Sequence, residues 1–362
     1  MSTKLTMMRE NLQLAIRIME AYWRQTFPRL ERKKKTFFPE TVMIQTSSFC
    51  NAKCIICPYS EVANELPQGK MSWKLFKKII DECSQNNISK IALHLMNEPL
   101  MDSNFIDYLA YAREKNLHAG IGFSTNASLL NREKGKEIIK YIDVIHISFP
   151  SLDEDEYEKI TGLNFNVSFS NIDYFLSLTK KSSRKIKVRL IFVKPFNFYK
   201  NLRNYVEAER IKNFCNKRNI ACLRWLFFNR AGNLSNYKNY FQVVTRRTKL
   251  NGCSLPTKHS PLRLMPILFN GDVLLCCMDW RREIVVGNLN TQNIAEIWNS
   301  KLYKGILDKI YFGKKSNNNF LCTRCINDCK FSYFFNVSIG CIYLLFRKLF
   351  LSIGRMLKYQ KS

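Results

Sequence analysis

Three cysteines stand close together in one short stretch of the chain, at Cys50, Cys54 and Cys57. Their CxxxCxxC spacing follows a short apolar run at residues 41–45, of the kind that forms a buried strand. Three thiolates on one loop can bind three irons of a cubane cluster and leave the fourth iron without a protein ligand. Structural zinc prefers four protein ligands, and no fourth cysteine or histidine lies close by in the sequence. The spacing therefore predicts an open iron–sulfur site that can bind a small molecule.

A second set of cysteines lies in the C-terminal third of the chain. It comprises Cys253, the adjacent pair Cys276 and Cys277, the CxxC pair Cys322 and Cys325, and Cys329. Two ligands from a strand and its loop, joined to a distant CxxC pair, would complete a four-thiolate site. Such a site suits zinc and an iron–sulfur cluster equally, so the spacing alone does not choose the metal.

The remaining cysteines and the histidines show no ligand spacing. We predict that Cys83, Cys215, Cys222 and Cys341 are small buried side chains, and that His94, His118, His146 and His259 are structural. Residues 1–35 lack an uninterrupted apolar core and a small-residue cleavage site, so no signal peptide is indicated. The 13 cysteines are therefore expected to be reduced in the cytoplasm, where clustered cysteines bind metal or catalyse more often than they form disulfides.

Alternating strand-like and helix-like patterns must position the first cysteine loop. The strand-like segments are residues 41–45, 89–96, 118–124, 143–149, 185–193 and 220–228, and the helix-like segments are residues 102–116, 131–141, 166–181 and 201–218. A further helix is predicted after Ser72, with Leu75, Phe76, Ile79, Ile80 and Cys83 on its inward side. This alternation predicts an α/β fold with a parallel sheet, a partial (β/α)6 barrel whose chemistry lies in the loops after the strands.

The chain divides into four predicted parts. Residues 1–40 form a basic amphipathic helix, residues 41–233 the partial barrel, residues 234–332 a small cysteine-rich domain, and residues 333–362 an apolar and basic C-terminal helix. Both terminal helices can pack on the body or lie on a membrane surface, and packing is the commoner outcome for such patterns.

The charge of the chain is strongly positive. Its 57 lysines and arginines face 29 aspartates and glutamates, a formal net charge of +28, and the basic residues are spread along the sequence. Such a field favours anionic partners such as nucleotides, phosphorylated sugars, nucleic acid or anionic membranes. The alternative is a lysine- and asparagine-rich bias of the sequence without functional meaning. The charge alone decides neither between these two interpretations nor among the anionic partners.

The first cysteine loop resembles the signature of the radical S-adenosylmethionine (SAM) superfamily, in which the open iron binds the amino and carboxylate groups of SAM. Asn97-Glu98-Pro99 resembles the family's glycine-glycine-glutamate-proline motif, which implies that Glu98 accepts a hydrogen bond from the SAM amino group. The segment 124–126 is similar to the family's serine-threonine-asparagine-glycine element, which implies that Ser124 and Asn126 face SAM. Ser148 and Arg189, on the fourth and fifth strands, are expected to line the same site. The chain departs from the pattern at residues 96–97, which replace two glycines, at Ala127, which replaces one, and at Ile56, where an aromatic residue is usual.

The second cysteine set resembles the auxiliary-cluster domains called SPASM and twitch, which follow many radical SAM cores. Cys276 fits their GxxxxC element, and residues 287–289 followed by Ile297-Trp298 fit the stretch before the last cysteines. The resemblance implies at least one auxiliary 4Fe–4S cluster, because the longer cysteine run that holds two is absent from the sequence. We assign its ligands as Cys253, Cys276, Cys322 and Cys325, with Cys277 as a substitute and Cys329 as a further ligand or a spare.

The resemblance also implies a reaction. A 4Fe–4S cluster reductively cleaves SAM to methionine and a 5′-deoxyadenosyl radical, which removes a hydrogen atom from the substrate. Auxiliary domains with one cluster resemble those of enzymes that dehydrogenate alcohol carbons of cyclitols or sugars, so we expect an oxidoreductase acting on such a small molecule, conjugated to an anionic group such as a nucleotide. The alternatives are radical modification of a peptide or protein, and a non-catalytic iron–sulfur or zinc adaptor at a membrane surface.

The expected partners follow from that reaction. They are the anionic substrate and a reducing electron donor such as flavodoxin or ferredoxin. Nucleic acid is disfavoured because no RNA-binding module is recognisable. The expected location is cytoplasmic. Whether the termini also make peripheral contact with the inner face of the membrane is an alternative that the sequence does not decide.

Overall fold

The computed structural model describes residues 27–86, 88–116, 118–194, 202–226, 230–234, 250, 252–253, 255, 259–313 and 319–325. These residues form a nine-stranded sheet in the order β6-β5-β4-β3-β2-β1-β7-β8-β9. The strands are β1 (Thr41–Ile44), β2 (Lys90–Ala92), β3 (Gly120–Thr125), β4 (Val144–Ser148), β5 (Lys187–Lys194), β6 (Ala221–Leu226), β7 (Leu264–Ile267), β8 (Asp272–Leu274) and β9 (Val285–Asn288).

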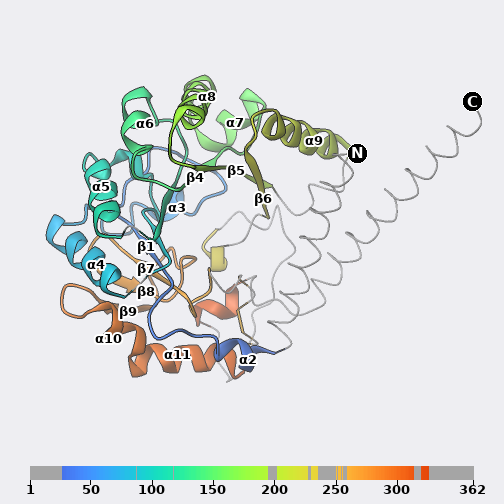
Figure 1. Ribbon diagram of the computed structural model, residues 1–362. Coiled ribbons are helices and arrows are strands. Elements are labelled where there is room, and N and C mark those ends of the chain that lie inside the picture. The colour runs from blue at the N-terminus through green and yellow to red at the C-terminus, as the bar shows by residue number, and fades with distance from the viewer. Residues whose placement is uncertain are drawn as a thin grey trace, which may run out of the picture.

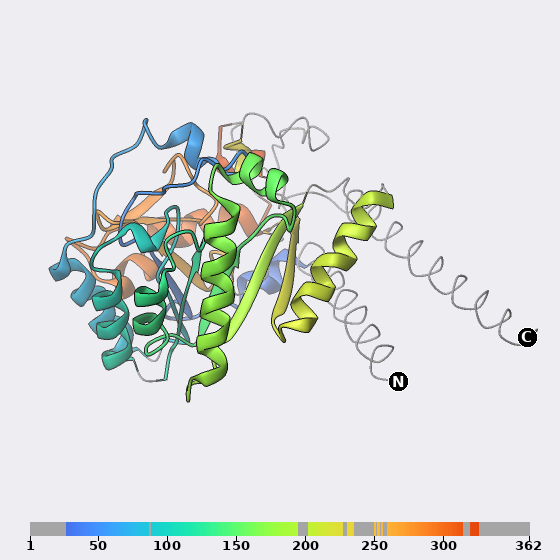
Figure 2. The ribbon, with the colours of Figure 1, turned by 90° about the horizontal axis from the view of Figure 1, so that it is seen from above.

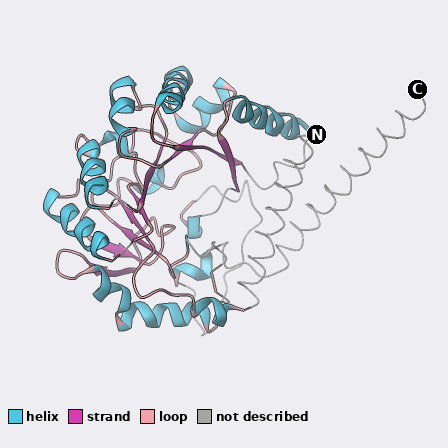
Figure 3. Ribbon diagram, in the orientation of Figure 1, coloured by secondary structure: helices cyan, strands magenta, loops and turns pink. Residues whose placement is uncertain are grey.

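The first six strands run parallel to one another, and helices connect them. The main connecting helices are α4 (Trp73–Gln85), α5 (Phe105–Lys115), α6 (Arg132–Ile138), α8 (Phe165–Lys181) and α9 (Leu202–Lys217). Figure 3 shows the strands as an inner layer with the helices around them, and Figure 2 shows α9 beside β6 at the end of the sheet. The predicted α/β partial barrel is confirmed.

The sheet continues beyond β1 into the C-terminal part of the chain. β7 pairs with β1 in parallel, from Thr41 opposite Leu264 to Ile44 opposite Ile267, and β8 and β9 follow as antiparallel strands. The helices α10 (Ile294–Asn299), α11 (Lys301–Tyr311) and α2 (Pro28–Arg32) lie on this side of the molecule (Figure 1). The sheet therefore crosses the boundary expected near residue 233, and that boundary stays a prediction.

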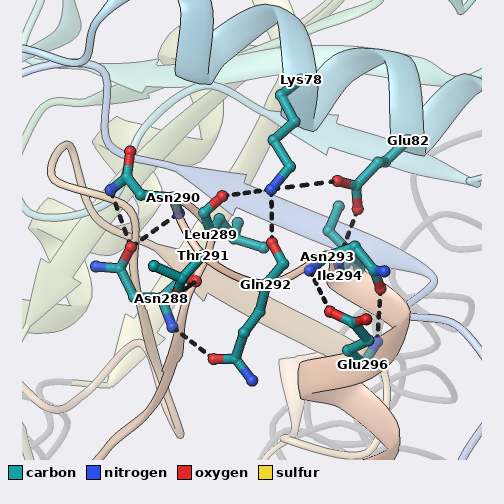
Figure 4. A network of polar contacts seen from close by, with 10 residues as sticks. All are labelled: Lys78, Glu82, Asn288, Leu289, Asn290, Thr291, Gln292, Asn293, Ile294 and Glu296. Atoms are coloured by element: carbon teal, nitrogen blue, oxygen red, sulfur yellow. Dashed lines mark hydrogen bonds and ion pairs between the residues drawn. The ribbon is translucent and has the colours of Figure 1, made fainter.

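A polar network joins α4 to the segment that follows β9 (Figure 4). Lys78 Nζ donates to the carbonyl oxygens of Leu289 at 2.6 Å and Gln292 at 2.7 Å. Glu82 accepts a hydrogen bond of 2.6 Å from the Ile294 amide at the start of α10. These bonds satisfy backbone groups that would otherwise lack partners at the end of β9 and the start of α10. They attach the cysteine-rich region to the barrel.

The helix predicted after Ser72 illustrates how the pattern forms the core. Ser72 Oγ accepts from the Leu75 amide at 3.2 Å and caps α4, as serine commonly does at a helix start. The five residues predicted to face inward, Leu75, Phe76, Ile79, Ile80 and Cys83, are all buried. Phe76 packs against Tyr108 of α5 with ring centroids 4.3 Å apart. This prediction is confirmed.

Two local expectations were wrong or incomplete. The strand predicted over residues 89–96 ends at Ala92, because the chain then turns towards the cysteine loop, with the Glu98 amide donating to the carbonyl of Phe49 at 2.9 Å. The short helices α3 (Tyr59–Val62) and α7 (Glu154–Thr161) were not predicted. Each buries only one or two side chains, which leaves no helical periodicity to read.

Several expectations lie outside the described residues. They are the helical segment before residue 27, the C-terminal helix over residues 333–362, and the roles of Cys329 and Cys341. Among the described helices, none combines the length and apolar character that crossing a bilayer requires.

Candidate functional site

The first cysteine loop follows β1 and is fixed from several directions. The Cys50 amide donates to Tyr59 Oη at 2.9 Å. The amides of Lys53 and Ile55 donate to the carbonyls of Thr161 and Ile160, at 2.9 and 3.0 Å, at the end of α7. The helix that sequence patterns missed therefore supports the loop.

The three thiols of this loop are half-buried and lie close together. Burial raises the pKa of Cys50 to about 12 and also raises the pKa values of Cys54 and Cys57. Cys54 lies near enough to the other two for each to raise its pKa further. Metal binding to such thiols must displace protons. Across the described residues, no three His, Cys, Asp or Glu side chains lie close enough together to bind one metal ion. A cubane cluster does not need such spacing, because each thiolate binds a different iron.

Glu98 connects this loop to the ends of two strands. It is 2% exposed, and its carboxylate accepts from Thr125 Oγ1 at 2.7 Å, from the Asn126 amide at 2.7 Å and from the Leu100 amide at 3.2 Å. Burial raises the pKa of Glu98 to about 7, although these hydrogen bonds and Lys134 oppose that shift. A carboxylate has about four acceptor positions, so one remains for a ligand donor.

The Asn126 side chain contacts the cysteine loop itself. Its Nδ2 donates to Asn51 Oδ1 at 3.0 Å, and Asn51 Nδ2 donates to Ser128 Oγ at 2.9 Å. Asn51 was not among the predicted site residues, and only its place between two cysteines could have indicated it. Glu98, Asn126 and the loop thus form one connected unit.

Polar atoms beside this unit lack partners. Gln45 Oε1, Thr46 Oγ1, Ser47 Oγ and Asn97 Nδ2 are buried without a hydrogen bond. Buried polar groups are normally satisfied, so four such atoms between β1 and Glu98 suit a site that receives a polar ligand. The amino, carboxylate and hydroxyl groups of SAM supply matching donors and acceptors, and the residues present therefore fit that cofactor.

A polar row crosses the inner face of the sheet, opposite the helices. Ser124, His146 and Arg189 stand side by side in register on β3, β4 and β5. Their neighbours Phe123, Ile145 and Leu190 belong to the core under the helices, and strand residues alternate between the two faces. The row is therefore directed away from the helices.

Within this row a histidine contacts the arginine, and the structural role predicted for the histidines stays a prediction. Arg189 Nη1 lies 3.2 Å from His146 Nε2, and no ion pair to Arg189 forms within the described part of the chain. His94, which follows β2, has a buried Nδ1 without a hydrogen bond. Burial, together with the charges of His146, Lys90 and His259, holds the pKa of His94 well below its usual range. Separate strands carry these histidines, so sequence spacing could not group them.

Ser148 occupies the next row towards the strand ends. It pairs with Ile191, two residues beyond Arg189 on β5. Two residues along a strand correspond to about 6.6 Å. Arg189 therefore lies one row deeper than Ser148, Glu98 and the cysteine loop.

The second cysteine set also gathers in space. Cys253, Cys276, Cys277 and Cys325 pack around Ala231, Leu255, Met278 and Leu321. Cys322 lies on the short turn η6 (Leu321–Arg324), and every described cysteine is a free thiol. Cys83 and Cys215 are buried as predicted, whereas Cys222 is only half-buried. The assembled thiols fit a four-thiolate cluster, with both Cys276 and Cys277 near it.

These features define a class of protein. The chain is a partial parallel barrel with a three-cysteine loop after its first strand and a buried glutamate beside that loop. A second group of cysteines gathers elsewhere in the structure. This combination is typical of an iron–sulfur protein with two separate cluster sites. The profile of the radical SAM superfamily matches residues 44–197, and that of the SPASM iron–sulfur cluster-binding domain matches residues 259–326. The chain belongs to the radical SAM superfamily and carries a SPASM-type region. Its cofactors are SAM and 4Fe–4S clusters, including an auxiliary cluster, and its electron comes from a reductant.

Known proteins resemble the chain over most of its length. The S-adenosyl-L-methionine-dependent 2-deoxy-scyllo-inosamine dehydrogenase of Niallia circulans is 23% identical over 288 residues, which are 79% of this chain and 92% of that enzyme. The crystal structure of BtrN with AdoMet and 2-DOIA has a TM-score of 0.51 at 17% identity, over 80% of this chain and 93% of that one. SuiB of Streptococcus suis, bound to precursor peptide SuiA, has a TM-score of 0.60 at 18% identity, over 83% and 73%. The two structures support the fold.

Proposed function

We propose that the chain oxidises an alcohol carbon of a sugar- or cyclitol-like small molecule that carries an anionic group. When bound, the cofactors supply a carbon radical that removes a hydrogen atom and a second cluster that accepts an electron. The relative that matches most of this chain is named as a dehydrogenase of an aminocyclitol. Loss of one hydrogen atom, one electron and one proton converts such an alcohol to a ketone.

In this proposal, Cys50, Cys54 and Cys57 hold the SAM-binding cluster. Glu98 accepts from the SAM amino group, while Ser124, Asn126 and Ser148 contact its ribose and carboxylate. Cys253, Cys276, Cys322 and Cys325 hold the auxiliary cluster, with Cys277 as a substitute, and the role of Cys329 stays a prediction. The connected hydrogen bonds between Glu98, Asn126 and the first loop support the first assignment.

The β4 and β5 members of the inner row, His146 and Arg189, carry the substrate proposal, while Ser124 on β3 faces SAM. The imidazole and guanidinium groups offer several donors and acceptors on one face, which suits a ring with several hydroxyl groups. Arg189 is the cation of this row, and its position two strands away from Ser124 and one row below Ser148 favours a substrate contact over the SAM contact expected from the sequence. The guanidinium would bind a phosphate or carboxylate of the substrate.

The formal charge of +28 also supports an anionic substrate. A donor of the flavodoxin or ferredoxin type and a cytoplasmic location remain predictions, as does membrane contact through the termini. Peptide modification and the adaptor role are the outcomes that the experiment below must distinguish.

Deuterium transfer tests the proposal. Candidate cyclitol and sugar phosphates, deuterated at one alcohol carbon, are incubated with reconstituted enzyme, SAM and dithionite. We expect deuterium in 5′-deoxyadenosine for one of them and a ketone product, and no transfer from the same molecule deuterated at a neighbouring carbon. If deuterium reaches 5′-deoxyadenosine from a deuterated peptide but from none of the sugars or cyclitols, the substrate class is a peptide and the proposal is wrong. An adaptor would form no 5′-deoxyadenosine.

A further inference from the structure

One short segment, residues 276–280, connects the surroundings of the two cysteine sets. Cys276, Cys277 and Met278 pack within the second set. Two residues further on, Trp280 packs in the apolar cluster that Cys57 of the first set also contacts. A side chain beside Met278 is therefore near both sets at once.

Arg230 is that side chain. Its Nη1 donates to Met278 Sδ at 3.4 Å, while its Nε is buried without a hydrogen-bond partner. Thioether sulfur is a weak acceptor and does not neutralise a guanidinium. Within the described residues no carboxylate forms an ion pair with Arg230, whereas Arg324 on η6 has its partner in Glu283. Among the described residues, Arg230 is thus a cation without a carboxylate partner.

The backbone around Arg230 holds it in this place. Arg230, Ala231 and Gly232 form the turn η3 (Arg230–Gly232), with φ values of 50°, 55° and 78°. Non-glycine residues adopt this left-handed region at a cost in free energy, and such residues concentrate at functional sites. Asn233 Nδ2 donates to the carbonyls of Arg230 at 2.6 Å and Met278 at 3.1 Å, which ties the turn to residues 276–280. η3 also contacts η6 of the second set.

The charge of Arg230 acts on one thiol of each set. Burial raises the pKa of Cys57, and Arg230 opposes that rise. The pKa of Cys277 is lowered, first by its hydrogen bond with Cys276 and then by Arg230. Both effects agree with the contact of Arg230 with Met278, which stands in the chain between Cys277 of the second set and Trp280 of the cluster that Cys57 contacts.

We propose that Arg230 is a positioning residue that supplies a fixed cation between the two clusters and raises the reduction potential of the auxiliary cluster. Reduction adds one negative charge to a cluster, and a cation in a poorly hydrated site stabilises that charge. A more positive potential makes the auxiliary cluster a better acceptor for the electron released by substrate. The inference rests on the proposed auxiliary cluster, but not on the identity of the substrate.

The test measures the auxiliary cluster alone. In the full chain, Cys50, Cys54 and Cys57 are replaced by alanine, so that only the second set binds iron. Redox titration followed by electron paramagnetic resonance then gives the midpoint potential for Arg230→Gln and Arg230→Lys. The control is Arg281→Gln, an exposed arginine whose partner is Glu65. We expect a more negative midpoint for Arg230→Gln, a smaller change for Arg230→Lys and none for the control.

Three outcomes would overturn the proposal. The first is the same midpoint in Arg230→Gln and its parent. The second is loss of iron from both Arg230→Gln and Arg230→Lys, which would show that the charge is not the cause. If only Arg230→Gln loses iron and Arg230→Lys keeps it in full, the result supports a need for the charge. The third is a parent chain without iron, which would also remove the auxiliary-cluster assignment. SAM cleavage by the chain with its first set intact tests the proposed function separately.

Discussion

The Glu98 carboxylate accepts a hydrogen bond of 2.7 Å from the backbone amide of Asn126, and the Asn126 side chain donates to Asn51 at 3.0 Å. This chain of contacts joins the residue after β2, the end of β3 and the first cysteine loop. It orients the carboxylate beside the cysteines before any ligand binds. Preorganised polar groups of this kind lower the cost of binding.

Glu98 makes SAM affinity dependent on pH. Its pKa is raised to about 7 by burial, so the carboxyl group is mostly protonated below that pH and ionised above it. The ionised form is the stronger acceptor for the SAM amino group. We expect SAM to bind more tightly at about pH 8 than at about pH 6, by up to about tenfold per pH unit below the pKa. Equilibrium binding to the cluster-loaded enzyme measures this.

The matched variant is Glu98→Gln. It keeps the shape but cannot ionise, so we expect about 10- to 100-fold weaker SAM binding and a flatter pH profile. The same pH dependence in wild type and variant would contradict the role of Glu98.

How much the sequence could reveal is clear at Glu98 and Arg230. Glu98 follows a strand and belongs to a short motif, so the residues next to it in the sequence were enough to predict it as a site residue. Arg230 gains its importance from its contact with Met278, far away in the chain, which spacing does not record. The partial barrel was predictable because Val42, Ile79 and their equivalents repeat with strand and helix periods. The pairing of β7 with β1 was not, since no local pattern specifies a neighbour more than 200 residues away.

The first cysteine loop should hold its own iron. Removing one of three ligands leaves the cluster with too few thiolates, so Cys54→Ala should lose about four irons per chain while the auxiliary iron remains. Iron and sulfide analysis after anaerobic reconstitution measures the loss. Cys83→Ala is the matched control, because Cys83 is fully buried in the α4 core. Equal iron in wild type and Cys54→Ala would refute the assignment.

Arg189 should affect substrate binding more than SAM cleavage. Arg189→Met removes the charge of the inner row but keeps a long apolar side chain. We expect KM for the anionic substrate to rise by about 10-fold or more, in line with the loss of a charged hydrogen bond. SAM affinity should stay within about twofold of wild type. Steady-state kinetics and SAM binding separate the two. A large loss of SAM affinity would instead support the contact with SAM expected from the sequence.

Gly122 should be intolerant of a side chain. A Cβ atom there would lie 2.2 Å from the backbone oxygen of Val144 on the neighbouring strand β4. Strand separation would have to increase, so Gly122→Ala should cost about 1–3 kcal/mol in the free energy of unfolding. Gly305→Ala is the control, since a Cβ at this position in α11 meets no atom within 4 Å. It should stabilise the helix by about 0.5–1 kcal/mol. Thermal unfolding measures both variants. Equal stability of Gly122→Ala, Gly305→Ala and wild type would contradict the close packing of Gly122 against Val144.

Formation of 5′-deoxyadenosine tests the central claim most directly. The reconstituted enzyme is incubated anaerobically with SAM and dithionite, and 5′-deoxyadenosine and methionine are measured for wild type and Cys54→Ala. A radical SAM enzyme whose cluster is held by Cys50, Cys54 and Cys57 will form both products in wild type and neither in the variant. Equal product from the two proteins, or none from an iron-loaded wild type, would contradict the claim.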